Sequence, residues 1–252
     1  MTPDAVVAAL RAAGCVFAED EAALLLATPG PLAPLLARRL AGEPLEQVVG
    51  WAAFDGLRIV VAPGVFVPRR RSELLVRLAA EGLRAGAVVV DLCCGSGALG
   101  AAVRRRLPGI ELHAADADEA AVACARGNLP GARVWLGDLW DALPSRLRGR
   151  VSVVLANAPY VPSDAIALMP SEARDHEPRG ALDGGGDGLD VHRWIAAAAS
   201  GWLAAGGRVL IEVSHAQAPV AAGLFERSGL LPTVHTDDEL GATVVVGRNP
   251  LG

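Results

Sequence analysis

From Ala87 onward, the sequence alternates between short β-branched apolar runs and longer segments with helical periodicity. The runs AVVVDL, ELHAAD, RVWL, VSVVLAN and RVLIEV are typical of buried strands, and most of the segments between them predict helices. Strands joined through helices pair in parallel with right-handed crossovers, which predicts a doubly wound α/β sheet. Two further strands near 231–235 and 243–246 are joined by only TDDELGA, which is too short for a crossover helix. The last strand is therefore expected to run antiparallel.

Chain length and core composition agree with this fold class. The 252 residues are enough for one α/β domain with a small appendage. Hydrophobic residues make up 52% of the chain but aromatic residues only 4%, so the core must be built from Ala, Val and Leu. A core of small aliphatic side chains favours layered packing of helices on a sheet.

The N-terminal part has a different organisation. Residues 3–41 carry apolar positions at helical spacing, interrupted by glycine and by the Pro-rich stretch TPGPLAP, which predicts short helices. Asp55 and Gly56 separate two apolar runs and indicate a β-hairpin turn. A helix is expected to begin near Ser72. We therefore predict three parts, an N-terminal helical domain, a β-hairpin linker and an α/β domain, covering residues 1–48, 49–72 and 73–252.

The charged residues exclude several classes of protein. All 23 basic residues are Arg, and without Lys the chain cannot form a Schiff base, hold pyridoxal phosphate through a lysine, or use a Walker-type phosphate lysine. The net charge is −5, whereas a protein that depends on phosphate contacts is strongly basic. Nucleic acid is therefore not expected as the main partner.

Cysteine spacing and the N-terminal residues predict a cytoplasmic protein. Four cysteines lack paired CxxC spacing, and the first residues contain no basic segment followed by an apolar stretch. Residues 85–103 are the most membrane-like segment, but Asp91 in a Gly-rich loop argues against a membrane span. Cys93 and Cys94 are adjacent and have no nearby His, so we expect buried thiols and no metal site.

A glycine-rich turn follows the first strand of the α/β part. The sequence DLCCGSG, from Asp91 to Gly97, opens a helix, and glycines at such a turn let the backbone approach a ligand closely. Asp116 ends the second strand, where a carboxylate can accept both ribose hydroxyls, and Asp138 is placed to reach an adenine amino group. The alternative is that Gly95 and Gly97 only make a tight turn.

The fourth strand is followed by Asn157-Ala158-Pro159-Tyr160. This tetrapeptide resembles the N-P-P-Y signature of methyltransferases that use S-adenosylmethionine to methylate planar amide or amine nitrogens. The Asn157 side-chain oxygen and the carbonyl of Ala158 can accept the two N–H groups of such a nitrogen, and Tyr160 can pack near the flat group. No metal is required. The alternative is an ordinary turn at the end of a strand, since Asn and Pro are common turn residues.

From about Gly42 to Gly247, the chain resembles the protein-(glutamine-N5) methyltransferases that modify the Gly-Gly-Gln loop of peptide-chain release factors in translation termination. The matching stretches are GEPLEQVVG, GVFVPRRRSELLV (the family form is close to G-V-x-I-P-R-P-x-T-E), DLCCGSGALG, GDLWDAL, NAPY, EPRGALDGGGDGLDVHR and RVLIEV. The resemblance implies a class I, Rossmann-like methyltransferase fold with a mostly parallel seven-stranded sheet. It also implies S-adenosylmethionine as methyl donor, S-adenosylhomocysteine as product, and a release factor as protein partner.

The resemblance also assigns expected site residues. Catalysis and substrate binding are expected at Asn157, Ala158, Pro159 and Tyr160, with Glu177 as a further substrate-binding residue. The expected cofactor-binding residues are Asp91, Cys93, Cys94, Gly95, Ser96, Gly97, Asp116, Asp138, Leu139 and Asn157.

Several positions depart from the family pattern. Gln47 stands where the family usually has an aromatic residue, RRR at 69–71 replaces R-P-x, Cys93 replaces a glycine, and Ala158 replaces a proline. The N-terminal helical part is also short. These departures leave two alternatives open. One is an N-methyltransferase acting on another protein, a small molecule or a nucleic-acid base, and the other is a non-catalytic relative that binds S-adenosylmethionine.

For a few further residues, a purely structural role has to be weighed against a functional one. The stretch with Glu177 and the glycine run 184–188 predicts a long loop, which either closes over substrate or is a flexible surface loop. His176 and His192 could act as general bases, but a methylated amide can lose its proton to water, so we expect surface or capping residues. Glu212, at the end of the fifth strand, is expected to be a structural hydrogen-bond acceptor.

Overall fold

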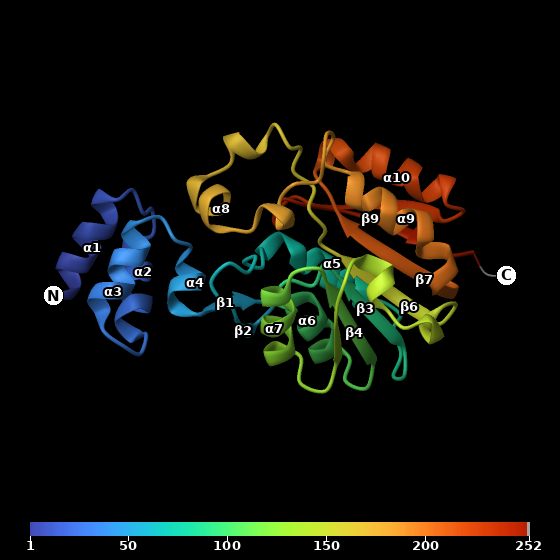
Figure 1. Cartoon of the computed structure of the whole chain (residues 1–252), viewed down its shortest axis with the longest axis horizontal. Coiled ribbons are helices and arrows are strands. Elements are labelled where there is room, and N and C mark those ends of the chain that lie inside the picture. The colour runs from blue at the N-terminus through green and yellow to red at the C-terminus, as the bar shows by residue number, and fades with distance from the viewer. Residues whose placement is uncertain (251–252) are drawn as a thin grey trace.

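The computed structural model describes residues 1–250. Its N-terminal region is a group of four helices, drawn in blue in Figure 1, as the helical periodicity predicts. They are α1 (Pro3–Ala12), α2 (Ala18–Ala27), α3 (Leu32–Leu40) and α4 (Leu45–Val49). Val6, Leu10, Leu25 and Leu36 are buried between them, so this helical region has a small apolar core of its own.

The predicted hairpin is confirmed. Strands β1 (Trp51–Phe54) and β2 (Leu57–Val60) pair antiparallel. Asp55 and Gly56 connect them with φ of +47° and +70°. Positive φ at both central residues is the requirement of a tight hairpin turn, which explains the Asp-Gly pair. The chain then runs through the turn η1 (Arg70–Ser72) into α5 (Glu73–Ala80).

The predicted α/β sheet is also confirmed. It has seven strands in the order β5-β4-β3-β6-β7-β9-β8, and β9 is antiparallel to both of its neighbours. Chain order reverses between β3 and β6, and ligands bind at such a switch point in doubly wound sheets. The strands are β3 (Val88–Leu92), β4 (Glu111–Asp116), β5 (Arg133–Leu136), β6 (Val151–Ala156), β7 (Leu203–Glu212), β8 (Leu231–Asp237) and β9 (Ala242–Arg248).

Helices cover both faces of this sheet (Figure 1). Alternate strand residues point to opposite faces, so Val89 and Val153 join one apolar core while Val90 and Val154 join the other. A strand buried on both faces is apolar throughout, which explains the runs VVVDL and VSVVLA. The helices are α6 (Ala98–Arg106), α7 (Glu119–Asn128), α9 (Asp190–Trp202) and α10 (Ala218–Arg227), together with α5.

The long loop after β6 contains structure that the sequence did not predict. Its elements are η4 (Ile166–Leu168), α8 (Ser171–His176) and η5 (Arg179–Ala181), and short turns elsewhere are η2 (Leu139–Ala142), η3 (Ser145–Leu147) and η6 (His215–Gln217). Arg39 of α3 is buried and forms ion pairs with Glu21 of α2 and Glu172 of α8. Removing one partner from a buried ion pair is costly, so this cluster holds the loop to the helical region.

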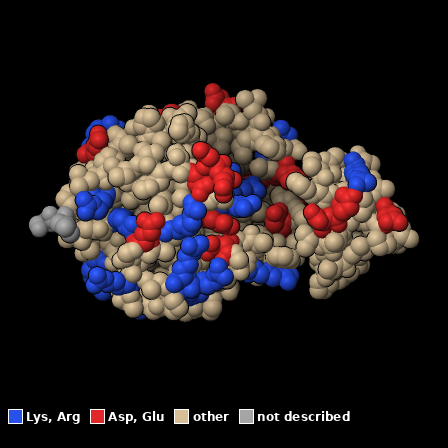
Figure 2. All heavy atoms as spheres, turned by 180° about the vertical axis from the view of Figure 1, so that it is seen from behind, with Lys and Arg blue, Asp and Glu red and all other residues tan. Residues whose placement is uncertain are grey.

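The surface on the back of the molecule is hollowed where the helical region meets the rest (Figure 2). Acidic and basic side chains are interspersed over this face rather than gathered by sign. Among the described helices, none is both long and apolar enough to cross a membrane. The domain boundaries proposed from the sequence remain a prediction.

Candidate active site

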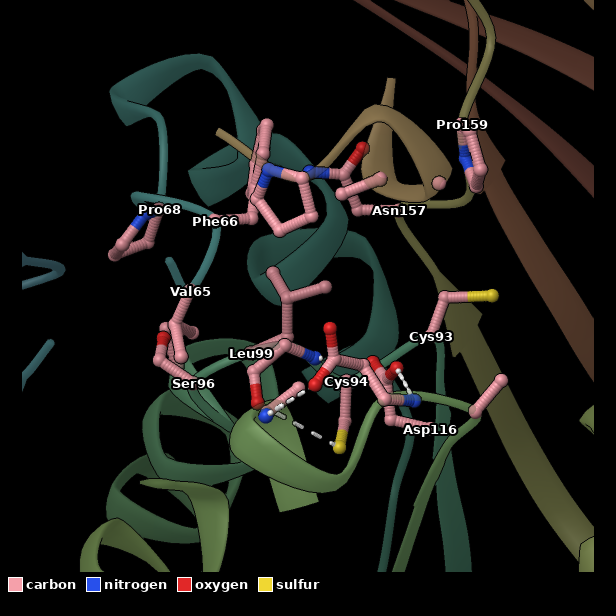
Figure 3. A pocket seen from close by; sticks show the side chains of 18 of the residues that line it. Val65, Phe66, Pro68, Cys93, Cys94, Ser96, Leu99, Asp116, Asn157 and Pro159 are labelled. Carbon is pink, nitrogen blue, oxygen red and sulfur yellow. Dashed lines mark hydrogen bonds between the residues drawn. The ribbon is translucent and has the colours of Figure 1, made fainter. Parts of the chain in front are cut away.

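A cavity of about 400 Å³ lies at the carboxyl ends of β3, β4, β5 and β6, a volume within the range of small-molecule sites. In Figure 3, Asn157 and Pro159 lie on one side of it, while Cys94 and Asp116 lie on the opposite side. The sequence-predicted residues in its wall are Cys93, Cys94, Gly95, Ser96, Asp116, Asp138, Leu139, Asn157 and Pro159. The structure therefore brings the glycine-rich turn and the Asn157 loop to one cavity.

The glycines of the turn are required for two different reasons. Gly97 has φ +78°, and a Cβ there would lie 2.9 Å from the side chain of Leu129, so it permits close packing of α6 on α7. Gly95 has φ +52°, and a Cβ there would meet nothing within 4 Å. Because Gly95 lines the cavity, its bare backbone leaves open space for a ligand. The open backbone at Gly95 is compatible with the predicted contact with S-adenosylmethionine, which stays a prediction.

Two residues without glycine's freedom also adopt positive φ in this wall. Cys93 has φ +53° and Leu139 has φ +42°. Such a conformation costs an ordinary residue about 1–2 kcal/mol, and strain of this kind gathers at functional sites. Cys93 therefore adopts a backbone conformation that a glycine would take without strain. Burial raises the pKa of its thiol, so Cys93 stays protonated and is a poor nucleophile.

Asp116 is fixed at the end of β4 by two backbone N–H groups. Its Oδ2 accepts a hydrogen bond from Gly95 N–H at 2.8 Å, and its Oδ1 accepts one from Asp118 N–H at 3.0 Å. Burial raises the pKa of Asp116. A carboxylate has further lone pairs beyond these two bonds, which leaves acceptors for the two hydroxyls of a ribose.

Asp91 lies beneath the turn, and its side chain does not line the cavity. It is fully buried, and its Oδ2 accepts a hydrogen bond from Gly100 N–H at 2.8 Å, which ties β3 to α6. Its Oδ1 has no partner among residues 1–250. Burial raises the pKa of Asp91 to about 8. Asp91 therefore supports the glycine-rich turn by joining the strand before it to the helix after it. Its contact with the cofactor stays a prediction.

Asn157, Ala158, Pro159 and Tyr160, together called the amide clamp, follow β6 directly. The Asn157 Nδ2 donates a hydrogen bond to Ser72 Oγ at 3.2 Å. Ala158 is buried in the core between β6 and α9. Asn157 and Pro159 reach the cavity wall, whereas Ala158 and Tyr160 do not. The catalytic roles of the four residues stay predictions.

Tyr160 is held by a buried carboxylate. Its hydroxyl donates to Glu212 Oε1 at 3.2 Å, and Arg71 Nε donates to the same oxygen at 2.9 Å. The guanidinium of Arg71 lies 5.8 Å from the centre of the Tyr160 ring. Burial raises the pKa of Tyr160 to about 12, so the phenol stays neutral. Glu212 is thus the structural acceptor that the sequence predicts.

The glycine run supports the clamp from behind. A Cβ at Gly184 would lie 2.7 Å from the carbonyl oxygen of Pro159, and one at Gly188 would lie 2.2 Å from that of Tyr160. Gln217 Nε2 also donates to the Tyr160 carbonyl at 2.9 Å. These close approaches require glycine, and they place the run against the clamp backbone rather than in a free surface loop.

Glu177 is buried behind the cavity wall. Its Oε1 accepts a hydrogen bond from Val67 N–H at 3.0 Å, and its Oε2 bonds to Arg69 Nη2 at 2.6 Å. Both contacts hold the segment 64–68, several residues of which line the cavity. The substrate contact assigned to Glu177 stays a prediction, but the carboxylate is already engaged within the protein.

The interpretation of His192 as a surface or capping residue is wrong. Its side chain is fully buried because α9 packs on β7, and its Nε2 lies 3.1 Å from the backbone oxygen of Glu212. Burial lowers its pKa to about 4, so the imidazole is neutral near pH 7.

Sequence reasoning missed part of the cavity wall. Most of the missed wall residues are apolar or glycine and belong to no chemical motif. Ser72 is predicted from the sequence only as the start of a helix. Within residues 1–250, no group of three or more His, Cys, Asp or Glu side chains is arranged to hold a metal ion. The missed wall residues include Phe54, Gly64, Val65, Phe66, Pro68, Ser72, Pro178, Gly180, Ala181 and Val191.

Comparison with known proteins decides the family. Residues 56–191 match the family model of the methyltransferase small domain. The release factor glutamine methyltransferase of Geobacter sulfurreducens is 36% identical over 217 residues, which cover 84% of this chain and 75% of that protein. This chain belongs to the release factor glutamine methyltransferase family. It is therefore an enzyme of the methyltransferase class.

Two further similarities add to this assignment. The chain is also similar to a protein that carries a different name. A 4-amino-L-phenylalanine/4-methylamino-L-phenylalanine methyltransferase of Streptomyces pristinaespiralis is 36% identical over 233 residues. That match covers 87% of this chain and 78% of the relative. A solved methyltransferase from Pyrococcus furiosus has a TM-score of 0.58 at 16% identity and covers 78% of this chain and 90% of that one, which supports the fold.

We expect Gly97→Ala to destabilise the protein by about 2–4 kcal/mol, because it combines a strained φ with an overlap against Leu129. Affinity for S-adenosylmethionine should fall as well. The matched control is Gly127→Ala, at a helical glycine where a Cβ meets nothing within 4 Å, which should gain about 0.5–1 kcal/mol. Urea unfolding and calorimetry measure both effects, and equal stability of the two variants would contradict the packing argument.

Asp91 should make stability depend on pH. The pKa of Asp91 is about 8 in the folded protein, whereas the ordinary value of 3.8 applies to the unfolded chain. Between these two pH values, Asp91 is protonated in the folded chain and ionised in the unfolded chain. Stability from this group therefore falls as pH rises from about 4 to 8, by at most about 1.4 kcal/mol per pH unit. Asp91→Asn cannot titrate and should show a flatter profile. Urea unfolding at pH 5 and pH 7 tests this, and parallel profiles would count against it.

Proposed function

We propose that the protein transfers the methyl group of S-adenosylmethionine to the side-chain amide N5 of a protein glutamine, in the Gly-Gly-Gln loop of a peptide-chain release factor. The observation that carries this proposal is that Gly95 and Asn157 line one cavity. A cofactor seated on the glycine-rich turn and an amide held by the clamp would then meet at short range. A release factor acts in translation termination, so we expect the enzyme to work in the cytoplasm.

The clamp residues suit an amide nitrogen, which is a poor nucleophile because its lone pair is delocalised. Asn157 Oδ1 and the carbonyl of Ala158 would each accept one N–H of the acceptor. Holding both N–H groups orients the nitrogen lone pair toward the methyl donor, and fixed acceptors stabilise positive charge developing on the nitrogen. Tyr160, neutral and anchored on Glu212, lies outside the wall of this cavity and would flank the part of the acceptor that extends beyond it.

The residues that would hold S-adenosylmethionine are on the opposite side of the same cavity. Gly95 leaves room for the methionine end, Asp116 offers acceptors to the ribose, and Asp138 and Leu139 complete the wall where the base would lie. When bound, the cofactor supplies an activated methyl group on its sulfonium. We propose that the amide nitrogen is methylated directly, with no covalent intermediate on the protein, and that the methylated amide then loses one N–H proton to water.

A second candidate is methylation of a small aromatic amine. It is supported by the similarity to the 4-amino-L-phenylalanine/4-methylamino-L-phenylalanine methyltransferase, which covers as much of the chain as the release factor enzymes do. An aryl amine also has a delocalised lone pair and two N–H groups, so the same clamp would serve it. Nucleic acid is a weaker candidate because the net charge is −5 and the basic residues are dispersed in Figure 2.

Two parallel incubations, one with each acceptor, separate the two candidates. Purified enzyme is incubated with isotope-labelled S-adenosylmethionine and either a release factor or 4-amino-L-phenylalanine. Mass spectrometry should find one methyl group on the glutamine of the Gly-Gly-Gln loop and no turnover of the amino acid. Methylation of the amino acid alone would replace the proposal with the second candidate, and cofactor binding without any transfer would indicate a non-catalytic relative.

We expect Asn157→Ala to lower methyl transfer at least about 100-fold, because it removes one of the two acceptors that orient the nitrogen. Binding of S-adenosylmethionine should stay within a few fold, since most of its cavity wall is unchanged. Asn249→Ala is the matched control, because Asn249 bonds to the Leu203 and Ala204 carbonyls away from the cavity. Undiminished turnover in Asn157→Ala would rule out the clamp role.

A further inference from the structure

We infer that Ser72 is a positioning residue that holds the Asn157 side chain in its place in the cavity wall, an inference that rests on the proposed function. Ser72 closes the turn η1 and lies far from Asn157 in sequence, yet its Oγ accepts the hydrogen bond from Asn157 Nδ2 at 3.2 Å. Both residues line the cavity. The contact therefore joins the segment after the hairpin to the amide clamp.

The Ser72 hydroxyl has no competing local duty. Ser72 precedes α5, where a serine side chain commonly caps the helix, but here it makes no capping hydrogen bond. Its backbone N–H is already paired with the Arg69 carbonyl at 2.9 Å. The residue is 1% exposed, so a buried hydroxyl is kept in place with Asn157 as its side-chain partner. Buried polar groups are almost always hydrogen-bonded, and the bond with Asn157 is the one that satisfies the Ser72 hydroxyl.

The hydrogen bond limits the conformations that are open to the Asn157 side chain. Without it, the side chain could rotate about its torsions and move its amide away from the cavity. With Nδ2 bound to Ser72, Oδ1 is the atom left to accept an N–H from the methyl acceptor. Ser72 therefore holds Asn157 in a position from which it can bind the acceptor.

The rest of the clamp is held by other contacts, which do not reach the Asn157 side chain. Gln217 holds the Tyr160 carbonyl, and Gly184 and Gly188 pack against the carbonyls of Pro159 and Tyr160. These contacts hold the main chain on the C-terminal side of Ala158. The Asn157 side-chain torsions are restricted by the Ser72 bond.

The test compares Ser72→Ala with Ser72→Thr, which keeps the hydroxyl and matches the residue at this position of the family form. We expect Ser72→Ala to lower kcat/KM for the acceptor about tenfold, with the Kd for S-adenosylmethionine within twofold, because one orienting bond is lost. Ser72→Thr should restore most of the activity. Ser228→Ala, which loses a hydroxyl bond to the Leu224 carbonyl on α10, should behave as wild type.

A readout without acceptor separates this inference from the proposed function. The Asn157 side-chain amide signal in ¹H–¹⁵N spectra, identified by its loss in Asn157→Ala, should shift in Ser72→Ala and stay near its wild-type position in Ser72→Thr. If the signal shifts in this way but no acceptor is methylated, the orienting role holds and the proposed function fails. If release factor is methylated and Ser72→Ala matches wild type, or loses cofactor affinity equally, the inference is overturned.

Discussion

Parallel pairing of β3 with β6 is the constraint on which the site depends. Its register places Leu92 opposite Ala156, so Cys93 and Asn157 leave the sheet side by side at the switch point. The first begins the glycine-rich turn and the second begins the amide clamp. Because both strands are buried on both faces, a shift in register would displace apolar side chains from two cores at once. The packing of the sheet thus sets the distance between the two halves of the cavity.

Much of this arrangement could be predicted from sequence because its signals are local. Strand and helix periods, the Asp55-Gly56 turn and the glycines of DLCCGSG each report the backbone of their own segment. Residues that act across the chain give no such signal. Ser72 reaches Asn157 and Glu177 reaches Val67 only after folding, and His192 is buried by packing of α9 that no local pattern specifies.

The departures from the family pattern are accommodated where contacts from elsewhere define the backbone. Cys93 takes a left-handed conformation that a glycine would adopt without strain, held by the strand before it and the turn after it. Ala158 lacks the ring of a proline, yet the clamp is fixed from behind by Gln217 and by the close approach of Gly184 and Gly188. Rigidity that a proline would supply locally is therefore supplied by neighbouring segments.

Contacts between distant segments also build the part of the cavity wall that would discriminate between methyl acceptors. The cofactor side of the cavity is built on strand ends, whereas the wall across from it comes from the segment 64–68 and from the loop around Pro178. Glu177 links these two segments through Val67 and Arg69, and Arg39 links the loop to the helical region through Glu172. Under the proposed function, acceptors of different size would be distinguished by this connected outer wall, since the clamp would recognise only a planar nitrogen with two N–H groups.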